Sequence, residues 1–93
     1  MTVKVTIEME GIMINEAFAG ASAEEVVGKM KARAVKEMNF AMRLAINAMS
    51  NLMFAQEVVK RYNSHKKLSL PVPGTCQDFI SLAAEHGFAE ITP

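Results

Sequence analysis

The sequence predicts an α+β fold in which a small antiparallel sheet packs against helices. Residues 3–9 alternate apolar and polar side chains, as a half-buried strand does. Residues 23–63 carry apolar side chains at helical spacing. Residues 76–86 repeat that spacing over a shorter segment. The whole chain of 93 residues has the length of a single domain, residues 1–93.

The N-terminal segment, residues 3–19, is expected to form a β-hairpin. Its first strand (VKVTIEM) places one row of apolar side chains on one face. Glu10 and Gly11 then mark a tight turn, and residues 12–19 (IMINEAFA) supply the return strand. Because a hairpin with one apolar face is not stable alone, helices must cover that face. The row consists of Val3, Val5, Ile7 and Met9.

The central helical segment is expected to begin at about Ala23. Ser22 and Glu25 fit a capping box, in which the serine side chain accepts from the Glu25 N–H and the Glu25 side chain bonds back. No glycine or proline interrupts residues 29–69. The apolar residues keep one bearing on a helical wheel, which favours one long helix or two collinear ones. Weak helix formers make residues 35–39 the expected place for a break.

The C-terminal third is predicted to contain a connector, a short helix and an edge strand. Residues 64–74 begin with a polar run and include two prolines, so they are predicted to form the connector. Thr75 is placed as the N-cap of a helix over residues 76–86. Gly87 suits the left-handed residue that ends this helix, and the terminal residues up to 92 suit an edge strand.

The stretch of residues 39–56 (NFAMRLAINAMSNLMFAQ) is apolar on two sides of the predicted helix and carries one charge, Arg43. A second apolar row lies opposite the first and has the three- and four-residue spacing of a helix–helix seam. Two asparagines inside this seam would fix its register. We therefore expect a homodimer or a higher oligomer built on this helix. The candidate oligomer interface consists of Phe40, Leu44, Asn47, Asn51, Phe54, Val58 and Tyr62.

The same stretch is also compatible with a membrane helix or with the core helix of a monomer. A membrane helix needs about twenty mostly apolar residues, and Arg43 with its neighbouring amides argues against one. In the core of a monomer, the asparagines would bond to loop backbone. Apolar residues make up 51% of the chain, which is high for a small monomer and favours the oligomer.

Charge and cysteine usage narrow the classes of partner and compartment. Ten basic residues balance ten acidic ones, which disfavours binding to nucleic acids or membrane surfaces through bulk charge. The single cysteine, Cys76, forms no intrachain disulfide, and a cytoplasmic location is the simplest expectation. The first ten residues lack the apolar run of a signal peptide.

No catalytic, cofactor or metal residue is predicted. His65, Cys76 and His86 lack the close pairing that zinc sites show. Cys76 stands in the first turn of a helix, where a thiolate is favoured, although a small buried residue is the preferred interpretation. His86 is expected to interact with the helix dipole. Glu8 and Glu10 share a strand face that is expected to be solvated.

Four basic residues lie within one sector of the helix, opposite the main apolar row, and we call them the basic ridge. Such a ridge can bind phosphates, which makes a small anionic ligand such as a nucleotide a candidate. Few aromatic residues interleave with it, so nucleic acid is not favoured, and a solvated face is the simpler interpretation. The basic ridge consists of Lys29, Arg33, Lys36 and Arg43.

Three functions therefore stay open. The first is a non-enzymatic interaction or regulatory module that self-associates or binds another protein through its helix. The second is a binder that sequesters an anionic ligand at basic ridges between protomers, as a small bacterial or phage accessory protein would. The third is an enzyme whose composite site between subunits uses Cys76 or a histidine.

Overall fold

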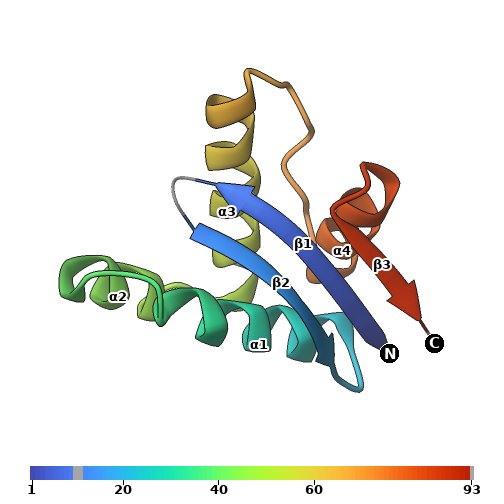
Figure 1. Cartoon of the computed structure of the whole chain (residues 1–93), viewed down its shortest axis with the longest axis horizontal. Coiled ribbons are helices and arrows are strands. Elements are labelled where there is room, and N and C mark those ends of the chain that lie inside the picture. Colours follow the sequence, from blue (N-terminus) through green and yellow to red (C-terminus); the bar gives the residue numbers. More distant parts are fainter. Residues whose placement is uncertain (10–11, 93) are drawn as a thin grey trace.

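The computed structural model of the chain describes residues 1–9 and 12–92, and within them it confirms the α+β class. A three-stranded antiparallel sheet is combined with helices that follow the N-terminal hairpin (Figure 1). In chain order the elements are β1 (Thr2–Met9), β2 (Ile12–Ala19), α1 (Ala23–Val35), α2 (Phe40–Asn47), α3 (Asn51–Lys66), α4 (Cys76–Glu85) and β3 (Ala89–Thr92).

The sheet has the order β2-β1-β3, so the first strand is central. The predicted hairpin is confirmed, with Val3 opposite Phe18 and Ile7 opposite Ile14. The predicted terminal edge strand is confirmed as well, and it places Ile91 on the other side of Val3. The turn at residues 10–11 lies outside the described residues.

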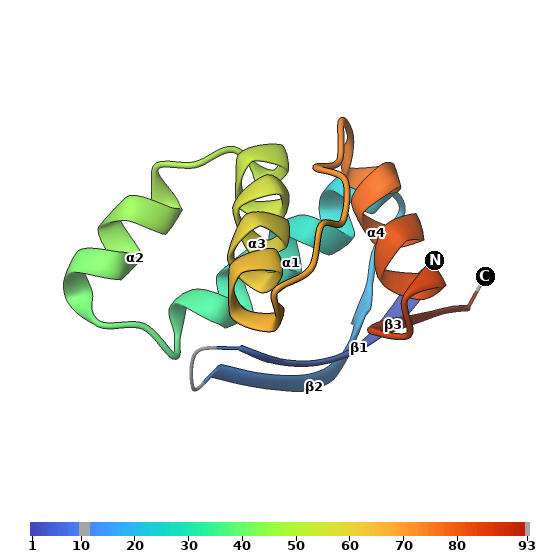
Figure 2. The same ribbon diagram turned by 90° about the horizontal axis from the view of Figure 1, so that it is seen from above.

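One face of the sheet is covered by helices and the other is left to solvent. Figure 2 shows the strands as one layer, with α1, α3 and α4 on one side of it. The side chains that alternate inward from β1 and β2 form the base of the core. The main members of this core are Val3, Val5, Ile14, Phe18, Val26, Val27, Met30, Phe54, Ala55, Val59, Phe79 and Ile80.

The expectation of one long helix or two collinear helices over residues 23–63 is wrong, because the segment forms three helices. The first break, after Val35, falls where weak helix formers predicted it. There the Asn39 side chain accepts a hydrogen bond from the Met42 N–H at 2.9 Å and caps α2. The second break was not predicted, and there Ser50 Oγ accepts from the Met53 N–H at 3.1 Å and caps α3. Short polar side chains interrupt an apolar helical pattern in this way, because their bond to the backbone begins a new helix.

The second break lets α3 run across α1 instead of continuing away from it (Figure 1). The two helices meet at Gly28, where an added Cβ would lie 3.0 Å from the Asn51 side-chain nitrogen. That nitrogen donates a hydrogen bond to the Glu24 carbonyl at 3.1 Å. Glycine at this position therefore allows the close approach that holds α3 over the sheet.

The predicted helix signals at the other ends are largely confirmed. Ser22 Oγ accepts from the Glu25 N–H at 3.2 Å, although the Glu25 carboxylate lies 3.7 Å from Lys29 Nζ and makes no bond back to Ser22 in the described structure. Thr75 Oγ1 accepts from the Asp78 N–H at 3.0 Å. Gly87 has a φ of 82°, the left-handed conformation expected after α4.

The connector starts later than residue 64, because α3 continues through the polar run to Lys66. Lys67, with a φ of 56°, ends the helix in the left-handed conformation. The Asn63 side chain then both donates to the Leu70 carbonyl at 2.9 Å and accepts from the Leu70 N–H at 3.0 Å. Gln56 donates to the Pro73 carbonyl at 3.0 Å. These bonds hold the extended connector against α3.

We expect Ser50→Ala to lower the free energy of unfolding by about 1 kcal/mol, because the Met53 N–H loses its acceptor. Ser50→Asp keeps an oxygen acceptor and should retain most of the stability. Urea unfolding followed by circular dichroism measures the change. Ser64→Ala, on an exposed part of α3, is the matched control and should change stability by less than about 0.5 kcal/mol. A loss in Ser50→Ala no larger than that of the control would contradict the capping role.

Candidate functional site

An apolar pocket lies between the covered face of the sheet and the helices, with a cavity volume of about 110 Å³. Every strand and helix contributes to its lining. Val5 and Ile14 form part of the sheet side, and Met30, Ile46 and Phe54 come from three different helices. The pocket is therefore a part of the core that the side chains of the chain leave unfilled.

The pocket reaches partly exposed side chains where α2 faces α3. Met42 of α2 and Val58 of α3 both line it and are half-buried. The charged side chains among its described lining residues are Glu57 and Arg61, whose Oε1 and Nε atoms lie 2.9 Å apart. An apolar interior with its rim charges paired accepts an apolar group without leaving a charge buried alone.

Tyr62 of α3 also lines the pocket. Its ring packs edge-on against Phe88, with the ring centroids 4.5 Å apart and the planes at 62°. This geometry is favourable for aromatic pairs. Phe88 follows α4 closely, so the contact joins α3 to the segment that leads into β3.

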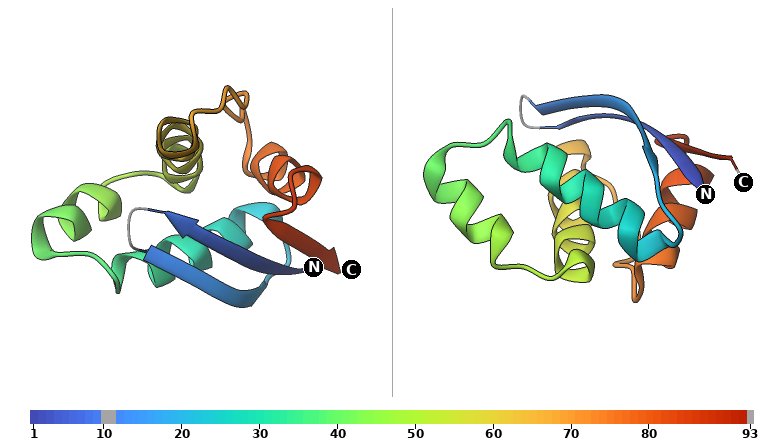
Figure 3. Two further views of the ribbon diagram at one scale, coloured as in Figure 1. Left: turned by 45° about the horizontal axis from the view of Figure 1, so that its top comes forward. Right: turned by 90° about the horizontal axis from the view of Figure 1, so that it is seen from below.

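The helix α2 stands apart from the sheet in all three ribbon views (Figure 1, Figure 2 and Figure 3). Its main contact with another helix is with α1, which precedes it in the chain. Only Ile46 of α2 is buried. Phe40 is 75% exposed and Leu44, one turn later, is 58% exposed. Ala41 and Ala45 beside them are also exposed. We call Phe40, Ala41, Leu44 and Ala45 the apolar strip of α2.

The seven residues of the predicted oligomer interface do not form one surface, because the break before α3 turns the second half away from the first. Phe40, Leu44 and Asn47 lie exposed on α2. Asn51 bonds within the chain to the Glu24 backbone. Phe54 is 4% exposed and belongs to the core, so it is not available to a partner. The last two members of the row, Val58 and Tyr62, line the pocket. Self-association itself stays a prediction.

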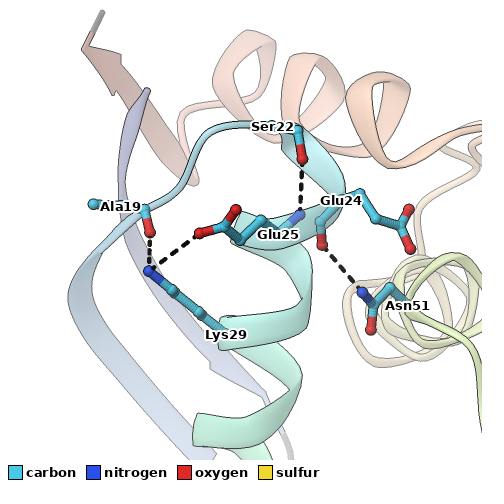
Figure 4. Close-up of polar contacts among 6 residues, drawn as sticks. All are labelled: Ala19, Ser22, Glu24, Glu25, Lys29 and Asn51. Carbon is cyan, nitrogen blue, oxygen red and sulfur yellow. Dashed lines mark hydrogen bonds and ion pairs between the residues drawn. The ribbon is translucent and has the colours of Figure 1, made fainter.

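The first half of the basic ridge is held by contacts within the chain. Lys29 Nζ donates to the Ala19 carbonyl and lies 3.7 Å from Glu25 Oε1 (Figure 4). The first of these contacts joins α1 to the end of β2. The ammonium group therefore supports the strand–helix junction as well as facing solvent.

Arg33 is paired more fully. Its Nε donates to Glu16 on β2, and its Nη1 donates to Glu37 at 2.8 Å. Both hydrogen bonds raise the pKa of Arg33, and the bond to Glu16 has the larger effect. Arg43 Nε donates to the Met38 carbonyl at 3.0 Å. Of the four ridge residues, only Lys36 has no such side-chain contact to another described residue.

Cys76 is buried in the first turn of α4, and its Sγ donates to Glu24 Oε2 at 3.2 Å. Burial, together with this hydrogen bond, raises the pKa of the thiol from 9.0 to about 11. The geometry thus agrees with the interpretation of a buried structural residue and gives no support to a reactive thiolate.

The other candidates for chemistry lie on the surface. His65 and His86 are exposed at the ends of separate helices, and the His86 ring stacks on Phe88 with a centroid distance of 6.3 Å. Glu8 is exposed, while Glu10 lies outside the described residues. Among the residues that the structure describes, no three histidines, cysteines or carboxylates are grouped to hold a metal ion.

No known protein family matches this chain, and neither the curated proteins nor the solved structures give a significant match. Within residues 1–9 and 12–92, no helix is long and apolar enough to cross a membrane. Sequence reasoning missed the pocket because its lining is scattered from residue 3 to residue 89. A local signal for a separate α2 was present in Asn39 and Ser50, two residue types favoured as N-caps.

The raised pKa of Cys76 predicts slow alkylation of the folded protein. At pH 8, iodoacetamide should modify Cys76 at least about a hundredfold more slowly than in the urea-unfolded chain, because two pKa units lower the thiolate fraction about that much. The folded-state rate should rise until the pH reaches about 11. Glu24→Gln should lower this pKa and speed the reaction, whereas Glu85→Gln, an exposed control, should not.

The raised pKa of Cys76 also determines whether the free energy of unfolding rises or falls with pH. Above pH 9 the unfolded thiol loses its proton before the folded one does, so the free energy of unfolding should fall as the pH rises toward about 11. Cys76→Ala should lack this part of the fall. Rapid alkylation of the folded protein at pH 8 would contradict the buried, carboxylate-bonded thiol.

Proposed function

We propose that this chain is a non-enzymatic interaction module that self-associates, and that the apolar strip of α2 supplies the contact. The observation that carries the proposal is the exposure of Phe40 and Leu44, one turn apart, on a helix that stands apart from the sheet. Contiguous apolar surface of this kind is typical of interaction sites in proteins. Aromatic residues are also favoured anchors of protein interfaces.

The composition of α2 suits a helix–helix contact. Its sequence FAMRLAIN carries one charged residue, Arg43, so the exposed side that holds the apolar strip accepts an apolar partner. Ala41 and Ala45 lie beside the two large side chains and allow a second helix to approach closely. A two-fold dimer would bury each of these residues twice, since both subunits present the same patch.

The two other functions have weaker geometric support. An anionic ligand at the basic ridge would compete with Glu16 and Glu37 for Arg33 and with Glu25 for Lys29. An enzyme that uses Cys76 would need to ionise a thiol whose pKa is raised to about 11. Self-association through α2 requires neither the loss of these ion pairs nor the ionisation of a buried thiol.

The proposal is tested by sedimentation equilibrium over a hundredfold dilution. We expect the wild type to be dimeric at high micromolar concentration and to dissociate on dilution. Phe40→Glu should be monomeric throughout, because the carboxylate would be buried in the contact. Met13→Glu is the matched control, since Met13 is an exposed apolar residue, at 61%, on β2 rather than on α2.

Both variants change exposed side chains, so circular dichroism and urea unfolding should match the wild type. A wild-type protein that stays monomeric at high micromolar concentration would overturn the proposal. Equal dissociation constants for wild type and Phe40→Glu would show that α2 is not the contact.

A further inference from the structure

We infer that α2 is helical only while its inner side is docked on the rest of the chain, and that this docking controls whether the apolar strip is formed. When α2 undocks, residues 40–47 lose their helical structure, the strip is lost and the pocket is uncovered. The undocking concerns a single chain. Its effect on pairing rests on the proposed self-association through α2.

The two sides of α2 have different surroundings. On the inner side, Met42 and Ile46 line the pocket, and Ile46 is 3% exposed. Phe40 and Leu44 are exposed, and they lie about 120–160° around the helix from those two residues. The side that carries the apolar strip is therefore separate from the side that holds α2 on the protein.

The docking of α2 rests on few contacts. The helix has eight residues and buries one of them, Ile46, whereas α1 has thirteen residues and buries five. Segments with few buried apolar contacts open locally, at a lower free energy than the whole fold. Isolated helices shorter than about 12 residues are marginal in water. An undocked α2 is therefore expected to lose its backbone hydrogen bonds.

The chain is fixed to α1 directly after α2. Lys31 Nζ of α1 donates to the Met49 carbonyl at 2.7 Å. Asn51, at the start of α3, donates to the Glu24 carbonyl at 3.1 Å. Figure 1 shows that α2 lies at one end of the molecule, beyond the helices that cover the sheet. Undocking of α2 therefore leaves α1, α3 and the sheet in place.

Pairing and docking then stabilise the same helix from opposite sides. Phe40 and Leu44 share one side only while the segment between them is helical. A partner that binds only the docked form shifts the population toward that form. Its apparent dissociation constant rises as the docked fraction of the chains falls. Ile46, which lies away from the strip, is thus a positioning residue for the pairing.

Amide hydrogen exchange followed by NMR tests whether α2 undocks separately, at a concentration where sedimentation shows monomers. After correction for intrinsic rates, we expect the N–H groups of residues 43–48 to exchange at least about tenfold faster than the N–H groups buried in α1 and α3. Low concentrations of urea should speed exchange in α1 and α3 but hardly change it in α2, because a local opening exposes little surface.

Val27→Ala gives the matched comparison by mutation. Val27 is fully buried on α1 and is not among the described residues that line the pocket, so its contacts remain when α2 undocks. The variant should speed exchange in α1 and α3 about tenfold and leave exchange in α2 unchanged. Equal acceleration in all three helices, or an equal response to urea, would mean that α2 opens only when the whole chain unfolds, and would overturn the inference.

Ile46→Ala tests the link between docking and pairing. Removal of a buried isoleucine side chain should shift the docking equilibrium by about thirtyfold or more. Exchange in α2 should then be faster, and the dissociation constant of the dimer should rise at least about tenfold. Ile91→Ala is the matched control, because it removes the same atoms from a 39% exposed position on β3, and it should change neither quantity. Ile46→Val should change both quantities by less, and it decides the result if Ile46→Ala does not fold.

The outcomes separate this inference from the proposed function. If α2 undocks separately but Ile46→Ala pairs as tightly as the wild type, pairing does not depend on docking, and the inference fails while the proposed function stands. If the wild type stays monomeric, the link to pairing fails together with the proposed function. In a wild type that dimerises, exchange in α2 should slow as dimers form, and an unchanged rate would contradict the link.

Discussion

Two side-chain caps determine how the central segment folds. Asn39 and Ser50 each accept a hydrogen bond from a backbone N–H three residues later, which starts a new helix where the apolar pattern alone would continue the old one. Without these interruptions, residues 23–63 would extend as a rod of roughly 60 Å, far beyond the 36 Å longest dimension of the molecule. The caps convert one apolar rod into α1, the separate α2 and an α3 that returns over the sheet.

The returning helix explains both the core and the pocket. Gly28 allows Asn51 to bond to the Glu24 carbonyl, so α3 crosses α1 closely and delivers Phe54 to the sheet. The helix α2 cannot reach the same face and buries only Ile46. One domain of this size has few side chains with which to fill its interior. An unfilled pocket and an exposed aromatic side chain are then two consequences of the same fold, and we propose that pairing of two copies covers the aromatic side chain.

Local patterns predicted most of the elements. Period-two alternation identified β1, and the turn signal after it predicted β2 as the return strand. The caps at Ser22 and Thr75 and the left-handed Gly87 followed from residue type. The second helix break was missed because the helical spacing of the apolar residues continues past Ser50. Only the hydrogen bond that the Ser50 side chain accepts from the Met53 N–H reveals the interruption. The pocket and the pairing of Arg33 with Glu16 could not be predicted from the sequence, because they depend on strands and helices that only tertiary packing brings together.

We propose that two copies of the chain pair through the apolar strip of α2. Isotope-filtered NMR on a mixture of ¹³C-labelled and unlabelled chains measures this contact directly, at a concentration where sedimentation shows a dimer. We predict nuclear Overhauser effects between the Phe40 ring protons of one chain and the Leu44 methyl protons of the other. A dimer in which neither Phe40 nor Leu44 shows intermolecular effects would contradict a contact through α2.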